Sequence, residues 1–145
     1  MPIHPSDQAD ADIDWFATDA SGYILHVASG GGRLPESVAA DEAALLELHA
    51  YFLSLPETTA AVPGEGVAVS NAEYPSHARY ARRGLFSFGK TDLHNGAHRQ
   101  YHVVARPARL LTVAELPEAL AELLGRTQWP GSTAAQTVID VATIA

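Results

Sequence analysis

A strand–turn–strand pattern near the N-terminus places the strongest constraint on the fold of this chain. Residues 14–29 read DWFATDASGYILHVAS, two short runs rich in aromatic and β-branched residues with Asp19-Ala-Ser-Gly22 between them. Aspartate can brace a tight turn through its side chain, and glycine can adopt the positive φ that such turns require. The segment therefore predicts a β-hairpin, and the glycines at 30–32 would end its second strand.

Helix signals occur at three later places. Asp41 precedes a run whose apolar residues repeat at helical spacing, so it caps a predicted helix that extends to residue 55, before Pro56. The segments 76–83 and 117–124 predict shorter helices, each followed by a glycine that can end it.

The remaining strand signals complete a simple order of elements. Residues 85–88 and 100–106 predict a second strand pair with Asn95-Gly96 at its turn, and 66–70 could add a short strand within a long loop. The tail from residue 133 could add an edge strand. This order predicts an α+β fold, an antiparallel sheet built from hairpins with two or three helices packed on one side. Because βαβ alternation is missing, a doubly wound nucleotide-binding fold is disfavoured.

Length and composition indicate one domain. A chain of 145 residues with 47% hydrophobic and 18% charged residues can bury a single core without disulfides, and it contains no cysteine. We expect a flexible leader at residues 1–12 and a single domain at 13–145. No apolar run is long enough to span a bilayer, and the first residues do not form a signal peptide, so a cytoplasmic protein without membrane contact is expected.

Charge is divided unevenly along the chain. Residues 1–75 carry 12 acidic and 1 basic side chains, whereas residues 76–145 carry 5 and 8. The formal net charge of −8 argues against nucleic-acid binding. Arg79 and Arg83 would share a helix face and, with Arg106, could hold a carboxylate or phosphate; alternatively, the arginines pair with the protein's own acidic half.

One segment matches a nucleotide-binding pattern by its letters. Gly84-LFSF-Gly89-Lys90-Thr91 fits the P-loop consensus G-x-x-x-x-G-K-[ST]. A phosphate cradle needs a curled loop followed by a helix, whereas these four intervening residues alternate as in a strand and a turn signal follows. We interpret the match as coincidental and predict no cofactor.

Metal-binding patterns are incomplete. Asp10, Asp12 and Asp14 reproduce the start of a calcium loop, but the glycine and glutamate that such a loop needs further on are missing. His94, His98 and His102 recur every four residues, but on a strand neighbours at that spacing lie about 13 Å apart, too far to share an ion. No metal site is predicted, and His26 and His49 stand alone with no interpretation.

The first hairpin offers a candidate docking surface. Trp15 and Phe16 are adjacent, so on a strand they point to opposite faces. If one ring is exposed, it would lie beside Asp12, Asp14 and Asp19 and would suit a cationic protein partner. The alternative is that a helix or the tail covers the outward ring.

Three segments together resemble a group of small bacterial proteins of unknown function. They are DWFATDASGYILHVASGG, the helix ending in YFLSLPE, and QYHVVARPARLLTVAELPEAL, and the resemblance covers about residues 14–125. Comparable proteins often act as immunity proteins that bind and neutralise a secreted toxin. The resemblance therefore implies a non-catalytic protein-binding module of immunity type, whose partner is a toxin or a second copy of the chain.

Two other function classes stay open at this point. The first is a small-ligand-binding protein or small enzyme with a pocket between sheet and helix, which converging histidine, arginine and carboxylate groups would favour. The second is a structural homodimer, which a broad self-complementary apolar patch would favour.

Overall fold

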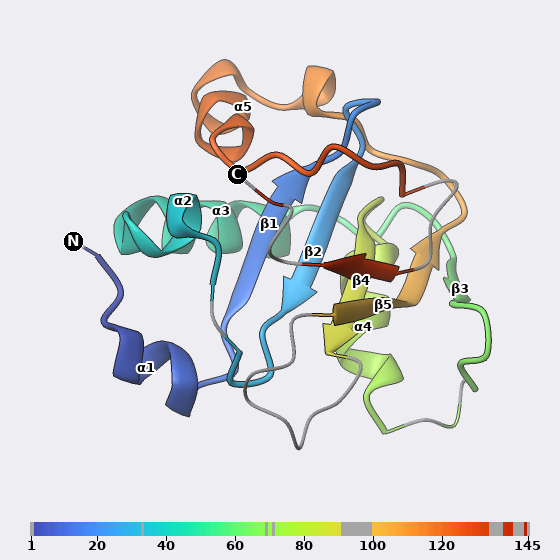
Figure 1. Cartoon of the computed structure of the whole chain (residues 1–145). Helices are drawn as coiled ribbons and strands as arrows, with labels where there is room; N and C mark the ends of the chain where they lie inside the picture. The colour runs from blue at the N-terminus through green and yellow to red at the C-terminus, as the bar shows by residue number, and fades with distance from the viewer. Residues whose placement is uncertain are drawn as a thin grey trace.

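In the computed structural model the chain forms a curled mixed sheet with helices packed around it, which confirms the predicted α+β class (Figure 1). The structure describes residues 2–32, 34–68, 70, 72–90, 100–133, 138–140 and 144. The helices are α1 (Pro5–Asp10), α2 (Glu36–Ala39), α3 (Glu42–Ser54), α4 (Tyr74–Ala81), the 3₁₀ turn η1 (Val113–Glu115) and α5 (Glu118–Gly125). The strands are β1 (Asp14–Thr18), β2 (Ile24–Ala28), β3 (Ala61–Pro63), β4 (Phe86–Lys90), β5 (Gln100–Pro107) and β6 (Val138–Asp140).

The sheet has the strand order β1-β2-β4-β5-β3, with β6 also paired to β5. The predicted hairpin is confirmed as β1 and β2, and its turn has Gly22 at φ +82°. One pair differs from the predicted antiparallel sheet, because β2 and β4 run parallel. The chain between these two strands passes over the sheet as α3 and α4 and re-enters in the same direction, the usual requirement of a parallel pair.

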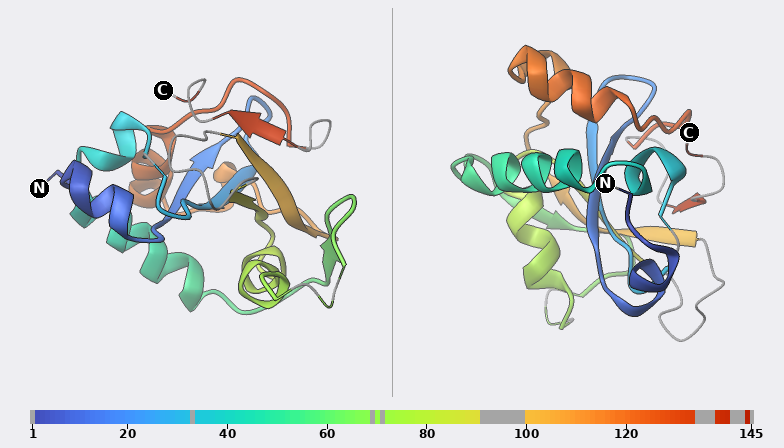
Figure 2. Two further views of the ribbon diagram at one scale, coloured as in Figure 1. Left: turned by 60° about the horizontal axis from the view of Figure 1, so that its bottom comes forward. Right: turned by 90° about the vertical axis from the view of Figure 1, so that its left-hand side faces the viewer.

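Helices lie on both sides of this sheet rather than on one. Figure 2 shows α3 and α4 on one side of the strands, with α1 on the other. Helix α4 packs on β4 and β5, whereas α3 and α5 pack on β1. None of the described helices is long and apolar enough to cross a membrane.

The expected flexible leader is a packed part of the fold. Ile3 is buried, and its backbone N–H donates to the carbonyl of Ala39 at 2.6 Å. The buried amide of Gln8 donates to the carbonyl of Ile3 and accepts from the N–H of Leu34. Pro5 occupies the first turn of α1, where its missing N–H costs nothing. One buried apolar side chain and one hydrogen-bonded amide therefore pack this short helix against the rest of the chain.

Helix boundaries follow the capping signals with small shifts. The Asp41 carboxylate accepts from the N–H of Ala44 and starts α3, as predicted. Helix α4 begins before the predicted cap, at Tyr74, because Pro75 is well suited to a first turn. The predicted helix 117–124 is confirmed as α5.

The short strand in the long loop lies earlier than residues 66–70. Strand β3 pairs with the end of β5, and Gly64 follows it closely. A Cβ at Gly64 would overlap the carbonyl of Val103, so only glycine lets the chain approach here. Gly66, at φ +77°, then turns the chain away from the sheet. The expected turn at Asn95-Gly96 lies outside the described residues, and β6 supplies the expected strand in the tail.

Both faces of the hairpin are covered. Trp15 and Phe16 point to opposite faces, as strand alternation requires, and their exposed fractions are 0% and 2%. Phe16 packs against Phe52 of α3 with a ring-centroid distance of 4.8 Å. Neither ring is available to a partner, so the docking surface considered for this hairpin is wrong and both aromatics belong to the core.

Candidate functional site

A chain of polar side chains, all buried except the partly exposed Asp14, crosses the sheet beneath α4. On β2, His26 lies opposite Phe16 of β1 and level with Ser87 of β4. His26 Nε2 lies 2.8 Å from Oδ1 of Asp14, and His26 Nδ1 lies 2.7 Å from Oγ of Ser87. From α4, His77 Nδ1 lies 2.6 Å from the same Ser87 oxygen. We call these four residues, Asp14, His26, Ser87 and His77, the polar chain.

Aromatic rings enclose one end of the polar chain. The Tyr80 ring stacks on the His26 ring with centroids 3.6 Å apart. The Tyr80 hydroxyl lies 3.3 Å from Nε2 of His49, and the same nitrogen lies 3.5 Å from Oδ2 of Asp14. These contacts fix the His26 ring and the Asp14 carboxylate in one orientation.

The environment sets the charge of each member of the polar chain. Burial would raise the pKa of Asp14, but the hydrogen bond from His26 and the nearby cations lower it below the usual range. Burial lowers the pKa of His26 despite its contact with Asp14. Burial, with the neighbouring His26, also lowers the pKa of His77 to about 3. At neutral pH the polar chain therefore holds one carboxylate and two neutral imidazoles.

A cavity of about 160 Å³ opens beside the polar chain, between the sheet and α4. Three elements contribute its walls: the start and end of the first hairpin, the exposed side of α4 and the end of β4. The polar and charged residues lining it are Asp12, Asp14, His26, Glu73, Ser76, His77, Arg79 and Lys90.

Lys90 is the least expected member of this wall. Its side chain is 3% exposed, and its Nζ is buried with no hydrogen-bond partner among the described residues. Nearby, Gly32 makes room for the Tyr101 hydroxyl, because a Cβ there would lie 2.6 Å from it, whereas the same Cβ would be in ordinary contact with Nζ of Lys90 at 3.6 Å. That hydroxyl donates to the carbonyl of Ser29, and it makes no hydrogen bond with the ammonium group.

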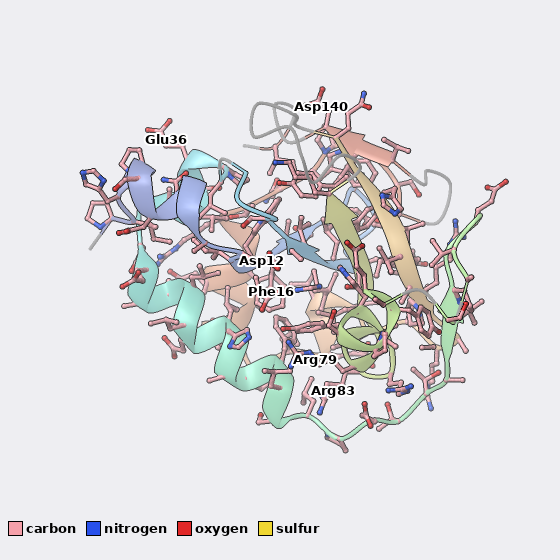
Figure 3. The ribbon with its side chains drawn as sticks, turned by 90° about the horizontal axis from the view of Figure 1, so that it is seen from below. Asp12, Phe16, Glu36, Arg79, Arg83 and Asp140 are labelled. Carbon is pink, nitrogen blue, oxygen red and sulfur yellow. The ribbon has the colours of Figure 1, made fainter. Side chains whose placement is uncertain are left out.

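The structure separates the three arginines proposed as a binding set. Arg79 lines the cavity, with its guanidinium carbon 4.9 Å from the centre of the Tyr80 ring. Arg83 instead donates to the carbonyls of Leu55 and Arg79, tying the end of α3 to α4. Figure 3 shows Arg79 and Arg83 on the side of α4 that faces α3. Arg106 lies on β5 opposite Val62 and does not line the cavity.

Asp12 and Asp14 reach the cavity, whereas Asp19 does not. Asp12 accepts from the N–H of Gly30 at the cavity wall. Asp19 is buried and braces the hairpin turn, where one oxygen accepts from the N–H groups of Ser21 and Tyr23. Of the acidic residues considered for docking, Asp19 is therefore structural.

Sequence reasoning missed His26, His77 and Ser87 as site residues. They lie 61 and 10 positions apart along the chain, and only the pairing of β2 with β4 brings them together. The one available signal was that His26 and Ser87 each occupy a buried strand position between apolar neighbours.

The P-loop letters fall on a strand, as the alternation indicated. Gly84, at φ +97°, ends the connection after α4, and residues 86–90 form β4 between β2 and β5. The backbone N–H groups of a central strand serve the sheet ladder and cannot converge on a phosphate. Thr91 lies outside the described residues.

The metal patterns do not converge in the part of the chain that the structure describes. No group of three or more histidine, aspartate or glutamate side chains there could hold an ion. His102 lies on β5 opposite Gly89, and its Nδ1 is buried without a partner. His94 and His98 lie outside the described residues.

Large exposed apolar side chains are scattered over the described surface. Leu46, Val62 and Val138 lie on α3, β3 and β6, respectively. Single exposed apolar residues are normal on a monomer and do not mark an interface.

No family model, no curated protein and no solved structure matches this chain.

Proposed function

We propose that the protein binds a small anionic molecule, a carboxylate or a phosphate, in the cavity beneath α4. The observation that carries this proposal is the ammonium group of Lys90 at the end of β4, which is buried and has no hydrogen-bond partner among the described residues. An uncompensated buried charge costs several kcal/mol, and an anion in the cavity would remove most of that cost. Arg79 supplies a second positive charge to the same space.

The wall holds three carboxylates, Asp12, Asp14 and Glu73, and each of them interacts with another part of the protein. Asp14 accepts from His26, and Asp12 accepts from the backbone of Gly30. Neither carboxylate forms a salt bridge with Lys90. Lys90 thus keeps its hydrogen-bonding capacity for a ligand.

The cavity limits the size of the ligand. A dry cavity of about 150 Å³ holds a molecule the size of benzene, so this one suits roughly six to eight non-hydrogen atoms. Converging histidine, arginine and carboxylate groups between sheet and helix favour the small-ligand class over a flat protein interface. An immunity-type protein-binding role stays a prediction, but Trp15 and Phe16 cannot form its docking surface because both rings are buried.

Isothermal calorimetry in an anion-poor buffer tests the proposal, with inorganic phosphate and short-chain carboxylates as probes. Saturable binding is expected, and Lys90→Met should weaken it at least tenfold while preserving or raising the melting temperature, because an unpartnered buried charge is removed. Arg82→Met is the matched control, since Arg82 is exposed and pairs with Glu57 away from the cavity. Failure of every anion to bind, or equal affinity in Lys90→Met, would overturn the proposal.

A further inference from the structure

Hydrogen bonds in the polar chain can run in only one direction. Asp14 is ionised because its pKa lies below the usual range, and an ionised carboxylate only accepts hydrogen bonds. The proton between Asp14 and His26 therefore sits on Nε2 of His26, 2.8 Å from the carboxylate.

Because His26 is neutral, the direction of its hydrogen bond with Ser87 is also determined. A neutral imidazole has one protonated nitrogen, so Nδ1 of His26 must accept. Its partner at 2.7 Å is the Ser87 hydroxyl, which consequently donates its single proton to His26. Ser87 Oγ can then only accept from its other neighbour.

That other neighbour is Nδ1 of His77, at 2.6 Å. Since Ser87 has no second proton to give, Nδ1 of His77 must carry the proton and donate it. His77 is neutral at physiological pH, so its Nε2 has none and presents a lone pair. The direction set at Asp14 is thus transmitted through His26 and Ser87 to Nε2 of His77.

The lone pair of His77 faces the proposed ligand site. His77 lines the cavity, and Nε2 lies 3.3 Å from the position that a Cβ on Gly89 would occupy. Within the described residues, no hydrogen bond to Nε2 is present. The absence of a side chain at Gly89 leaves this nitrogen accessible from the end of β4 that also carries Lys90.

We infer that the bound anion also carries a hydroxyl or amino group, and that His77 selects such ligands by accepting a hydrogen bond from that group at Nε2. The ligand class is therefore a small hydroxy or amino acid, with its anionic group toward Arg79, which lines the cavity from the same helix as His77, and its donor toward His77. This inference rests on the proposed anion site. Asp14, His26 and Ser87 act as positioning residues, because they hold the acceptor tautomer of His77 without touching the ligand.

A first test needs no ligand and no variant. Nitrogen-15 chemical shifts of the histidine rings in the wild-type protein distinguish protonated from unprotonated nitrogens. The expected pattern is a protonated Nδ1 and an unprotonated Nε2 for His77, together with a protonated Nε2 for His26. A protonated Nε2 on His77 at neutral pH would overturn the inference.

A second test measures selectivity by calorimetry with matched pairs of probes. Propionate, 2-hydroxypropionate and alanine share a carboxylate and differ in the donor on the second carbon. The wild-type protein should bind the hydroxy or the amino acid at least tenfold more tightly than propionate, because a site built around a hydrogen bond discriminates against analogues that lack it. Equal affinities would overturn the inference while leaving the anion site intact.

Ser87→Ala interrupts the polar chain without altering the cavity wall. The ratio of affinities between 2-hydroxypropionate and propionate should fall toward one in this variant, and the His77 ring should lose its fixed tautomer. Ser54→Ala is the control, since the exposed Ser54 hydroxyl bonds only to the end of its own helix. An unchanged ratio in Ser87→Ala would contradict the role of the polar chain. If no anion binds the wild-type protein at all, the proposed function fails, and this inference with it.

Discussion

The two faces of the same three strands differ in their side chains, because one face is apolar whereas the other combines the apolar Phe16 with a row of polar groups. On one face Trp15, Val27 and Phe88 come from β1, β2 and β4 and are fully buried in the core. On the other face Asp14, His26 and Ser87 come from the same strands and lie beneath α4. Strand alternation creates both surfaces from adjacent residues.

The comparison shows where this protein accepts a cost in stability. A buried apolar side chain stabilises the folded state. A buried polar group without a hydrogen-bond partner instead destabilises it by roughly 1–3 kcal/mol. The polar chain satisfies its members one after another, and it ends at His77 and near Lys90, where partners are missing. Among the described residues, Nε1 of Trp15 and Nδ1 of His102 are also buried without a partner, so a missing partner marks a binding site only where it coincides with a cavity, as it does beside His77.

The largest expected effect lies on the apolar face. Phe88→Ala should lower the free energy of unfolding by about 4 kcal/mol, since it removes a fully buried ring and leaves a cavity. Urea denaturation measures the change. Leu46→Ala, at a side chain that is 59% exposed, should stay within about 0.5 kcal/mol of the wild type. A loss below about 1 kcal/mol for Phe88→Ala would mean that this face is loosely packed.

Lowering the pH should destabilise the protein through the buried histidines of the polar face. Burial lowers the pKa of His77 to about 3, whereas the unfolded chain takes up that proton near pH 6.5. Between these values the unfolded state holds more protons, so the free energy of unfolding decreases as the pH decreases. His77 alone accounts for about 2 kcal/mol of loss from pH 6.5 to 5, and His26, whose pKa is also lowered by burial, adds to it in the same direction.

Urea midpoints at half-unit steps from pH 7 to 4.5 measure this dependence. His77→Gln should flatten the curve, because the variant has no buried imidazole on α4 to remain unprotonated. His4→Gln is the control, at an exposed histidine that caps α1. A stability that does not change between pH 7 and 5 would show that the polar chain is open to protons in the folded protein.

The smallest expected effect concerns the space beside His77. A Cβ at residue 89 would lie 3.1 Å from Cγ2 of Val104 and 3.3 Å from Nε2 of His77, so Gly89→Ala should cost about 1 kcal/mol. It should also shift the His77 ring resonances. Gly125→Ala is the matched control, because nothing lies within 4 Å of its Cβ position at the end of α5. A Gly89→Ala variant with unchanged stability and unchanged His77 resonances would contradict the close contact.

Much of the fold could be predicted from local patterns. The first hairpin, the helix after Asp41 and the helix before Gly125 occupy their predicted places, because turn chemistry, capping and periodicity act over a few residues. The packed leader and the early strand β3 were missed. Each depends on a contact with a distant segment, such as Gln8 with Leu34 and Gly64 with Val103.

Of the candidate site, the sequence located Asp12, Asp14 and Arg79 only as members of larger charged groups. Trp15 and Phe16 drew attention as adjacent aromatics, but the burial of a ring depends on what covers it. For the arginines, helical spacing correctly placed Arg79 and Arg83 near one another, yet it could not show that Arg83 is occupied by the carbonyls of Leu55 and Arg79.

The sequence by itself determined the elements, their order and the alternation of side chains along each strand, because these follow from interactions within a few residues. Only the tertiary structure decided that β2 and β4 are neighbours, and with that pairing His26 meets Ser87 across 61 positions of sequence. A buried histidine has the same local pattern whether it is a satisfied core residue or part of a site. What distinguishes the two is the hydrogen-bond partner on the neighbouring strand, and strand pairing is a long-range choice that depends on how the helices cover the sheet.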